Sequence, residues 1–170
     1  GWLTSNPELT HDIDTVFQQL SSLTQLRPPR QLLLAPFNLQ LQMLRLIQRV
    51  ADATTRGDVV GRIVVKANSL TDEVLVHELV RAGQAGVQID LVVRGACILP
   101  PGLPGLTDNI RVRSVVGRML EHTRVFYFRW GSEDHEEVLY LSSADWMNRN
   151  MTRRVEVAWP VRDPAQRQRV

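Results

Sequence analysis

The chain has 170 residues, 44% of them hydrophobic, and a formal net charge of +2. This predicts one compact domain with a sizeable core, and no uncharged apolar run is long enough to cross a membrane. A single cysteine, Cys97, excludes an internal disulfide and a thiolate zinc site. We therefore expect a cytoplasmic, reducing setting, with peripheral attachment to the inner membrane left open. The first four residues lack the pattern of a signal peptide, so none is expected.

The first half of the chain alternates predicted helices and strands. A helix begins at Pro7, behind Ser5 and Asn6, and is expected to end near Leu23, with a polar link over residues 25–29. Strands and helices then follow in alternation. They cover residues 32–35 (strand), 39–56 (helix), 63–67 (strand), 72–86 (helix) and 87–93 (strand). Such alternation predicts parallel pairing of the strands, with the helices packed on the sheet.

The second half changes character after a proline- and glycine-rich loop over residues 96–106. Strands are predicted near residues 110–116, 122–128, 138–142 and 155–161. The first two of these are expected to form a hairpin through a tight turn at Gly117 and Arg118. A charged hairpin loop over residues 131–137 contains His135, which we expect to be a solvated surface residue. We divide the chain into a leading helix and link (1–27), an α/β core (28–162) and a short polar tail (163–170).

The basic residues are unusual, because 19 of the 20 are arginine and one, Lys66, is lysine. Arginine suits bidentate contacts with oxyanions. Arg94 ends the third strand, where ligands bind in open α/β sheets, and Gly95 lets the backbone turn away. Lys66 and Asn68 end the second strand and are expected to complete a phosphate cradle beside Arg94. A solvated arginine and a turn-forming asparagine are the alternatives.

His122 and Arg124 share one face of an apolar strand and lie at its mouth. A cation beside an imidazole suits a phosphate or phosphoryl group. The alternative is a partly buried core histidine next to a surface arginine. Arg111, Arg113 and Arg118 add further cations nearby, so that four arginines are expected to flank one histidine.

Polar groups also interrupt the last two predicted strands. Ser142, Ser143 and Asp145 lie where a strand enters a turn, which suits phosphate oxygens, with a helix-capping turn as the alternative. Glu156 is a carboxylate inside an apolar strand, which costs free energy unless it is paired. It is expected either to orient an imidazole or to pair with Arg154 or with a cation across the strands.

Six segments in this order resemble one family over almost the whole chain, from about Leu3 to its end. They are 65–72 (VKANSLTD), 91–95 (LVVRG), 108–112 (DNIRV), 120–125 (LEHTRV), 140–147 (YLSSADWM) and 154–157 (RVEV). The chain resembles the C-terminal end of the long, phosphohistidine-forming bacterial polyphosphate kinases. The same segments resemble a phospholipase D half-site, whose pattern is His-x-Lys followed by a Gly-Ser-x-Asn turn. Here Arg124 replaces the lysine and the turn ends in Asp145, departures that argue against a working phospholipase or nuclease.

The resemblance implies an α/β fold with a mixed sheet and helices packed on it, one phospholipase-D-like half of a two-domain site. It implies reversible transfer of the terminal phosphate of ATP to polyphosphate, through a phosphohistidine in the preceding domain. Arg94 and His122 take the positions of the family's nucleotide-contacting arginine and second histidine. Glu156 takes that of the carboxylate supporting the phosphorylated histidine. Lys66, Asn68 and Arg124 are then expected to hold phosphate oxygens.

The implied ligands are ATP or ADP and inorganic polyphosphate, with magnesium held by residues upstream of this chain and no metal ligand within it. The implied protein partners are the preceding domain and further copies of the full-length enzyme, and no nucleic acid is expected. On this interpretation the isolated chain is inactive. Two alternatives stay open: a phosphodiesterase or nuclease built as a dimer of half-sites, and a non-catalytic polyanion-binding module that uses Arg111, Arg113 and Arg118.

Overall fold

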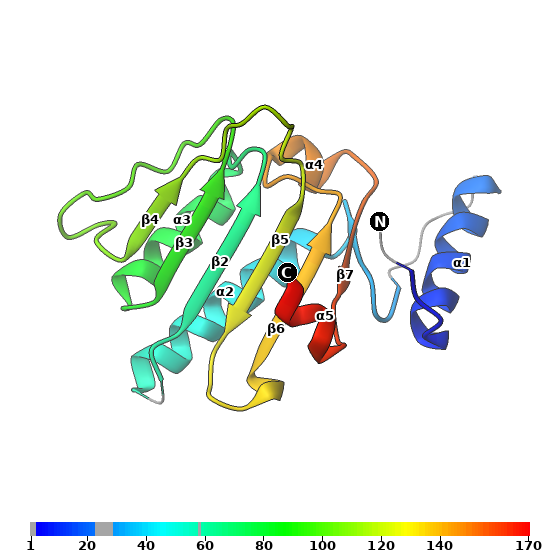
Figure 1. Cartoon of the computed structure of the whole chain (residues 1–170), viewed down its shortest axis with the longest axis horizontal. Coiled ribbons are helices and arrows are strands. Elements are labelled where there is room, and N and C mark those ends of the chain that lie inside the picture. Colours follow the sequence, from blue (N-terminus) through cyan, green and yellow to red (C-terminus); the bar gives the residue numbers. More distant parts are fainter. Residues whose placement is uncertain (1–2, 23–28, 58) are drawn as a thin grey trace.

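The computed structural model describes residues 3–22, 29–57 and 59–170, which form a seven-stranded sheet with helices packed on it (Figure 1). The spatial order of the strands is β1-β7-β6-β5-β2-β3-β4. Their bounds are β1 (Leu33–Ala35), β2 (Arg62–Ala67), β3 (Gln88–Val93), β4 (Ile110–Arg113), β5 (Arg124–Arg129), β6 (Glu137–Ser142) and β7 (Glu156–Pro160).

The helices begin and end where local chemistry specifies it. They are α1 (Pro7–Ser21), α2 (Leu39–Arg56), α3 (Glu73–Gln84), α4 (Asn148–Thr152) and α5 (Pro164–Arg169), with a 3-10 turn η1 (Asp134–Glu136). Asn6 caps α1 by accepting the N–H groups of Glu8 and Leu9, and Asp72 caps α3. Gly57, at φ +79°, ends α2. No helix in the described ranges combines the length and apolarity needed to span a bilayer.

The main core lies between the sheet and the two helices α2 and α3. Because side chains alternate along a strand, Val65, Leu91 and Phe126 all face these helices, in register on β2, β3 and β5. They pack in one buried cluster with Met43 of α2 and Leu79 of α3. Each such side chain contributes about 1.5–3 kcal/mol when fully buried. The opposite face, which we call the front face, carries α5 (Figure 1).

Strand direction determines where the functional side chains gather. β2, β3 and β4 are mutually parallel, whereas each pair along the series β2, β5, β6, β7 and β1 is antiparallel. As a result β2, β3, β4 and β6 end at the same edge at which β5 and β7 begin. We call this the carboxyl edge; it is the upper edge in Figure 1.

The predicted pairing of the first strand is wrong. β1 is not a neighbour of β2 but pairs antiparallel with β7 at the far margin of the sheet. The 18-residue helix α2, at about 1.5 Å per residue, is long enough to carry the chain behind the middle strands from one side of the sheet to the other. The predicted parallel pairing holds for β2 with β3 and extends to β4.

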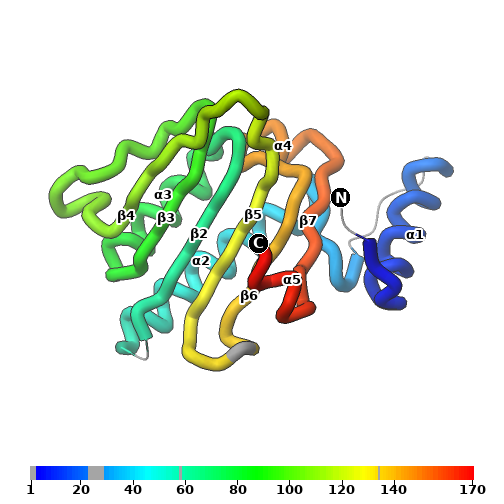
Figure 2. Tube along the Cα trace, in the orientation of Figure 1, coloured from blue at the N-terminus to red at the C-terminus, as the bar shows by residue number. Residues whose placement is uncertain are grey.

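The predicted hairpin over residues 110–128 is also wrong. β4 ends at Arg113, and β5 pairs with β2 and β6 instead of β4. The intervening residues 114–123, which we call the crossing segment, pass over the carboxyl edge from β4 to β5 (Figure 2). Val116, Met119 and Leu120 are 85%, 80% and 71% exposed, so the apolar residues there do not mark a buried strand.

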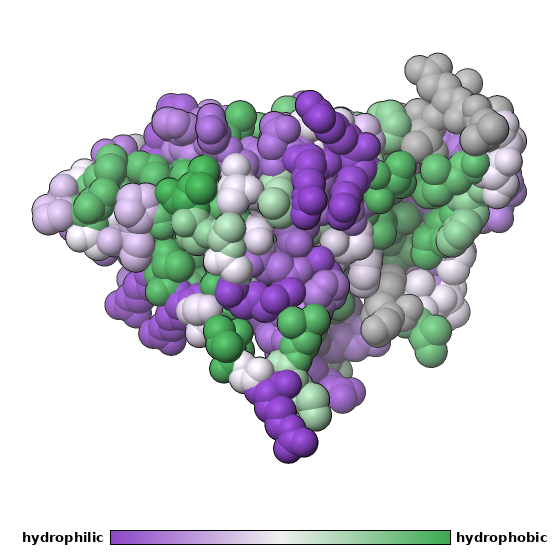
Figure 3. All heavy atoms as spheres, turned by 90° about the horizontal axis from the view of Figure 1, so that it is seen from above, coloured by the Kyte–Doolittle hydropathy of each residue, from purple (hydrophilic) through white to green (hydrophobic). Residues whose placement is uncertain are grey.

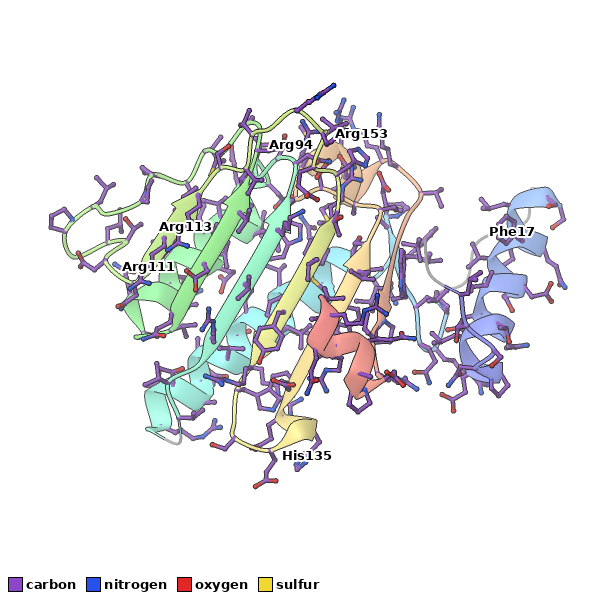
Figure 4. The ribbon with its side chains drawn as sticks, in the orientation of Figure 1. Phe17, Arg94, Arg111, Arg113, His135 and Arg153 are labelled. Carbon is purple, nitrogen blue, oxygen red and sulfur yellow. The ribbon has the colours of Figure 1, made fainter. Side chains whose placement is uncertain are left out.

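Other local predictions are confirmed. The charged loop joins β5 to β6, and His135 is exposed within it, far from the carboxyl edge (Figure 4). The polar tail forms the short helix α5. Leu23 and residues 25–28 of the predicted link lie outside the described residues.

A buried carboxylate ties α1 to the rest of the chain. Asp12 is 3% exposed. It accepts the backbone N–H groups of Arg30 at 3.1 Å, Gln31 at 2.6 Å and Leu32 at 3.0 Å. These bonds fix the chain as it enters β1.

We expect Asp12→Ala to lower the free energy of unfolding by about 2–3 kcal/mol, because it leaves several partly or fully buried N–H groups without an acceptor. Urea denaturation followed by circular dichroism measures the change. Asp14→Ala on the same helix removes an exposed contact with Gln18 and serves as the control. Equal stability of the two variants would contradict the role given to Asp12.

Candidate functional site

A buried carboxylate connects three strands at the carboxyl edge. Asp145 follows β6 and is 8% exposed. It accepts the backbone N–H of Asn68 at 2.7 Å and the side-chain amide of Asn68 at 3.1 Å. It also accepts Nε and Nη2 of Arg124, both at 3.2 Å. The four bonds join the end of β2, the start of β5 and the turn after β6.

The surroundings of Asp145 keep it ionised. Burial raises the pKa of the Asp145 carboxyl, but hydrogen bonds from Arg124 and Asn68 outweigh that effect and hold the pKa below its ordinary value. Both oxygens of this anion are therefore engaged by protein donors. The carboxylate therefore organises this edge of the sheet.

Arg94 is connected to Asp145 through Asn68. Nε of Arg94 donates to Oδ1 of Asn68 at 2.8 Å, while the amide nitrogen of Asn68 donates to Asp145. Within the described residues the two terminal nitrogens of Arg94 have no hydrogen-bond partner, and the side chain lies at the carboxyl edge (Figure 4). Gly95 is required beside it, because a Cβ there would lie 2.8 Å from the carbonyl oxygen of Asn68.

His122 completes the connected group. Nη1 of Arg124 lies 2.9 Å from Nδ1 of His122 and donates to the His122 carbonyl oxygen at 3.2 Å. His122 is exposed and lines a shallow depression of about 380 Å³ with Arg124, Ser142 and Trp159. Arg94, Asn68, Asp145, Arg124 and His122 thus form one continuous chain of contacts, which we call the edge network.

Lys66 does not join the predicted cradle of Asn68 and Arg94. Its Nζ donates to Oε1 of Glu121 at 2.6 Å and to the carbonyl oxygen of Thr123 at 3.0 Å. The hydrogen bond from Lys66, together with that from the backbone of Thr123, lowers the pKa of Glu121 to about 2. Lys66 therefore anchors the crossing segment just before His122. Glu121 was not identified from the sequence, although it immediately precedes the histidine.

Glu156 is satisfied without a cation. Its carboxylate accepts Oγ of Ser143 at 2.5 Å and Nδ2 of Asn150 at 2.7 Å. The alternative of an ion pair with Arg154 or with a cation across the strands does not hold among the described residues, because both Glu156 oxygens accept from these neutral donors. Asn150, which is 3% exposed, was missed by the sequence analysis.

The remaining candidates either stabilise the turn after β6 or lie exposed on the surface. Oγ of Ser142 donates to the carbonyl oxygen of Val157 at 3.0 Å and accepts the N–H of Ala144 at 3.0 Å, so it shapes the turn that holds Asp145. Arg118 is exposed in the crossing segment. Arg111 and Arg113 are exposed on β4 (Figure 4). Of the four arginines expected around His122, Arg124 alone contacts it within the described residues.

Polar residues occupy the middle of the molecule seen from above, toward the carboxyl edge, with apolar residues on either side (Figure 3). One apolar region includes a groove of about 340 Å³ between α1 and the strands β1 and β7. No group of three or more His, Cys, Asp or Glu side chains in the described ranges could hold a metal ion. The edge offers the guanidinium groups of Arg94 and Arg124 and the imidazole of His122, which suit an anion.

Residues 32–170 match the family model described as polyphosphate kinase C-terminal domain 2. The polyphosphate kinase of Synechocystis sp. is 48% identical over 164 residues, which are 96% of this chain and 22% of that protein. The crystal structure of polyphosphate kinase from Porphyromonas gingivalis matches with a TM-score of 0.89 and 38% identity, covering 97% of this chain and 25% of that chain.

The fold is also shared more widely. Nuc from Salmonella typhimurium, a phospholipase D family member, matches with a TM-score of 0.55 and 17% identity over 82% of this chain and 86% of that one. This likeness confirms the predicted phospholipase-D-like α/β fold and shows nothing further. The chain spans less than a quarter of the Synechocystis protein, yet the family model covers all seven strands of its described sheet and the whole edge network. On these grounds the chain belongs to the polyphosphate kinase family, in which it corresponds to the second C-terminal domain.

Proposed function

We propose that this chain supplies one half of the site at which ATP and polyphosphate reversibly exchange a phosphate. The observation that supports the proposal is the edge network, a chain of contacts that links Arg94 to His122 along one edge of the sheet. Family membership supplies the class of reaction. The other half, including the histidine that carries the phosphate, would come from the preceding domain.

Arg94 is the residue best suited to the phosphates of the nucleotide. Its Nε is fixed by Asn68, and its terminal nitrogens can donate to phosphate oxygens as charge redistributes in the transition state. His122, exposed beside the depression, can donate a hydrogen bond to an oxygen of the transferred group.

Glu156 would support the partner imidazole from the preceding domain. Its two oxygens accept from Ser143 and Asn150, yet a carboxylate has about four lone-pair sites. One ring N–H could therefore be accepted in addition, which would fix that imidazole and raise its basicity. Lys66 and Arg124 would act through Glu121 and His122, which they contact. Magnesium would be held by residues upstream of this chain, as the resemblance to the family implies.

The phospholipase D pattern has a lysine and an asparagine where this chain has Arg124 and Asp145. This difference favours phosphotransfer over phosphodiester hydrolysis. In this chain the two residues neutralise each other in an ion pair at 3.2 Å. The positions that would offer a free ammonium and a free amide to a diester are thereby closed. No comparable observation favours a purely polyanion-binding module.

In the intact enzyme, His122→Ala should lower turnover roughly 100- to 10,000-fold, the range of a lost acid–base or donor group. The measurement is ATP formation from ADP and polyphosphate. His135→Ala, in the exposed loop at the opposite edge, is the matched control and should retain its activity. Near-normal turnover of the His122 variant would remove this residue from the site.

Replacement of Arg94 by Gln in the intact enzyme should raise the KM for ADP roughly 10- to 100-fold, because a charged hydrogen bond is worth about 1.5–3 kcal/mol. Arg62→Gln is the control, since Arg62 pairs with Asp90 on the front face, away from the carboxyl edge. If both variants show the same KM as the parent, Arg94 does not bind the nucleotide.

The 170-residue chain by itself should show no turnover but should bind polyphosphate weakly, with an affinity that falls steeply as salt is raised. Calorimetry over a salt series measures the binding, and a coupled assay measures ATP formation. Appreciable ATP formation by this chain alone would show that no second domain is needed.

A further inference from the structure

The contacts of Arg124 determine which nitrogen of His122 carries the proton. We infer that Asp145 and Arg124 are a pair of positioning residues that hold His122 as the neutral tautomer protonated on Nε2. The inference rests on the proposed function only for the meaning of this tautomer in the reaction.

The chemistry of the guanidinium group determines which nitrogen is the acceptor. Arginine has five N–H donors, no acceptor, and remains protonated in proteins. Nη1 of Arg124 lies 2.9 Å from Nδ1 of His122, so Nδ1 must be the acceptor. A neutral imidazole that accepts through Nδ1 carries its hydrogen on Nε2.

Asp145 fixes the guanidinium of Arg124. Nε and Nη2 form a two-pronged contact with the two oxygens of Asp145, both at 3.2 Å. The side chains of Arg124 and Asp145 are 13% and 12% exposed, so this contact is largely shielded from water. With two nitrogens held, the plane of the guanidinium is set and Nη1 is directed at His122. Asp145 is fixed in turn by the backbone N–H of Asn68.

The carboxylate nearest in sequence to the His122 ring is already paired. Glu121 directly precedes His122, but its carboxylate is bound by Lys66 at 2.6 Å. Among the described residues no carboxylate accepts a hydrogen bond from His122. This differs from catalytic histidines whose Nδ1–H is held by a carboxylate, an arrangement that leaves Nε2 with a free lone pair.

The tautomer defines what His122 can do. With hydrogen on Nε2, the exposed nitrogen is a donor toward a phosphate oxygen and has no lone pair to attack phosphorus. Phosphoryl transfer onto this ring would first require the Nε2 proton to leave. Asp145 and Arg124 therefore make His122 a hydrogen-bond donor, and neither residue needs to touch the substrate.

Nitrogen NMR of the ¹⁵N-labelled chain tests the inference directly. Spectra are recorded near pH 8.5, well above the ordinary imidazole pKa of about 6.5, and His122→Gln identifies the His122 signals by their loss. We expect Nε2 to have the shift of a protonated ring nitrogen and Nδ1 that of an unprotonated one. A protonated Nδ1 in the parent chain would overturn the inference, whether or not any variant folds.

Two variants test whether Asp145 and Arg124 set the tautomer of His122. Asp145→Asn and Arg124→Met should both move the His122 nitrogen shifts toward a mixture of tautomers. Asp90→Asn is the matched control, because it breaks an arginine–aspartate pair on the front face and should leave them unchanged. Unchanged His122 nitrogen shifts in both Asp145→Asn and Arg124→Met would overturn the inference.

The spectra do not depend on turnover, so the two proposals can fail separately. Loss of activity in His122→Ala together with a protonated Nδ1 would support the proposed function but contradict the inference about the tautomer. The Nε2–H tautomer together with normal activity of His122→Ala would do the reverse.

Discussion

The carboxyl edge depends on one ionised carboxylate that is almost completely removed from water. An uncompensated charge in such a place costs several kcal/mol, and Asp145 avoids this cost through four hydrogen bonds from Asn68 and Arg124. The same bonds set the orientation of Asn68 and Arg124, which in turn contact the other two members of the edge network. Asn68 is turned so that its oxygen faces Arg94, and Arg124 is turned so that its remaining nitrogen faces His122. Arg94 and His122, which suit a phosphate, are thus positioned through Asp145, which is itself an anion.

The topology explains why such distant segments meet. β5 lies beside β2 but runs in the opposite direction, so the start of one strand adjoins the end of the other. The buried residues of these strands face α2 and α3, where hydrophobic packing stabilises the fold. The polar residues are at strand ends and in the turns beyond them, where they do not interrupt that packing. Stability and chemistry therefore draw on different residues of the same strands.

Much of the local structure could be predicted from the sequence because its signals are local. The caps Asn6 and Asp72, the terminating Gly57 and the apolar periodicity of α2 act within a few residues. Strand neighbours are different, since alternation shows which face is buried and not which strand lies alongside. The position of β1 and the path of the crossing segment were missed for this reason. Arg94 and His122 could be proposed as site residues from the sequence. The contacts of Asp145 could not be predicted, because its partner Arg124 lies 21 residues away on an adjacent strand.

The ion pair between Arg124 and Asp145 has a consequence for how this domain can diverge. Loss of the aspartate alone would leave a largely buried guanidinium unpaired, and loss of the arginine alone would leave a largely buried carboxylate unpaired. Substitutions at the two positions are therefore tolerated together more readily than one at a time. Sequences that share this scaffold should accordingly fall into discrete classes at this pair of positions, with few intermediates between them.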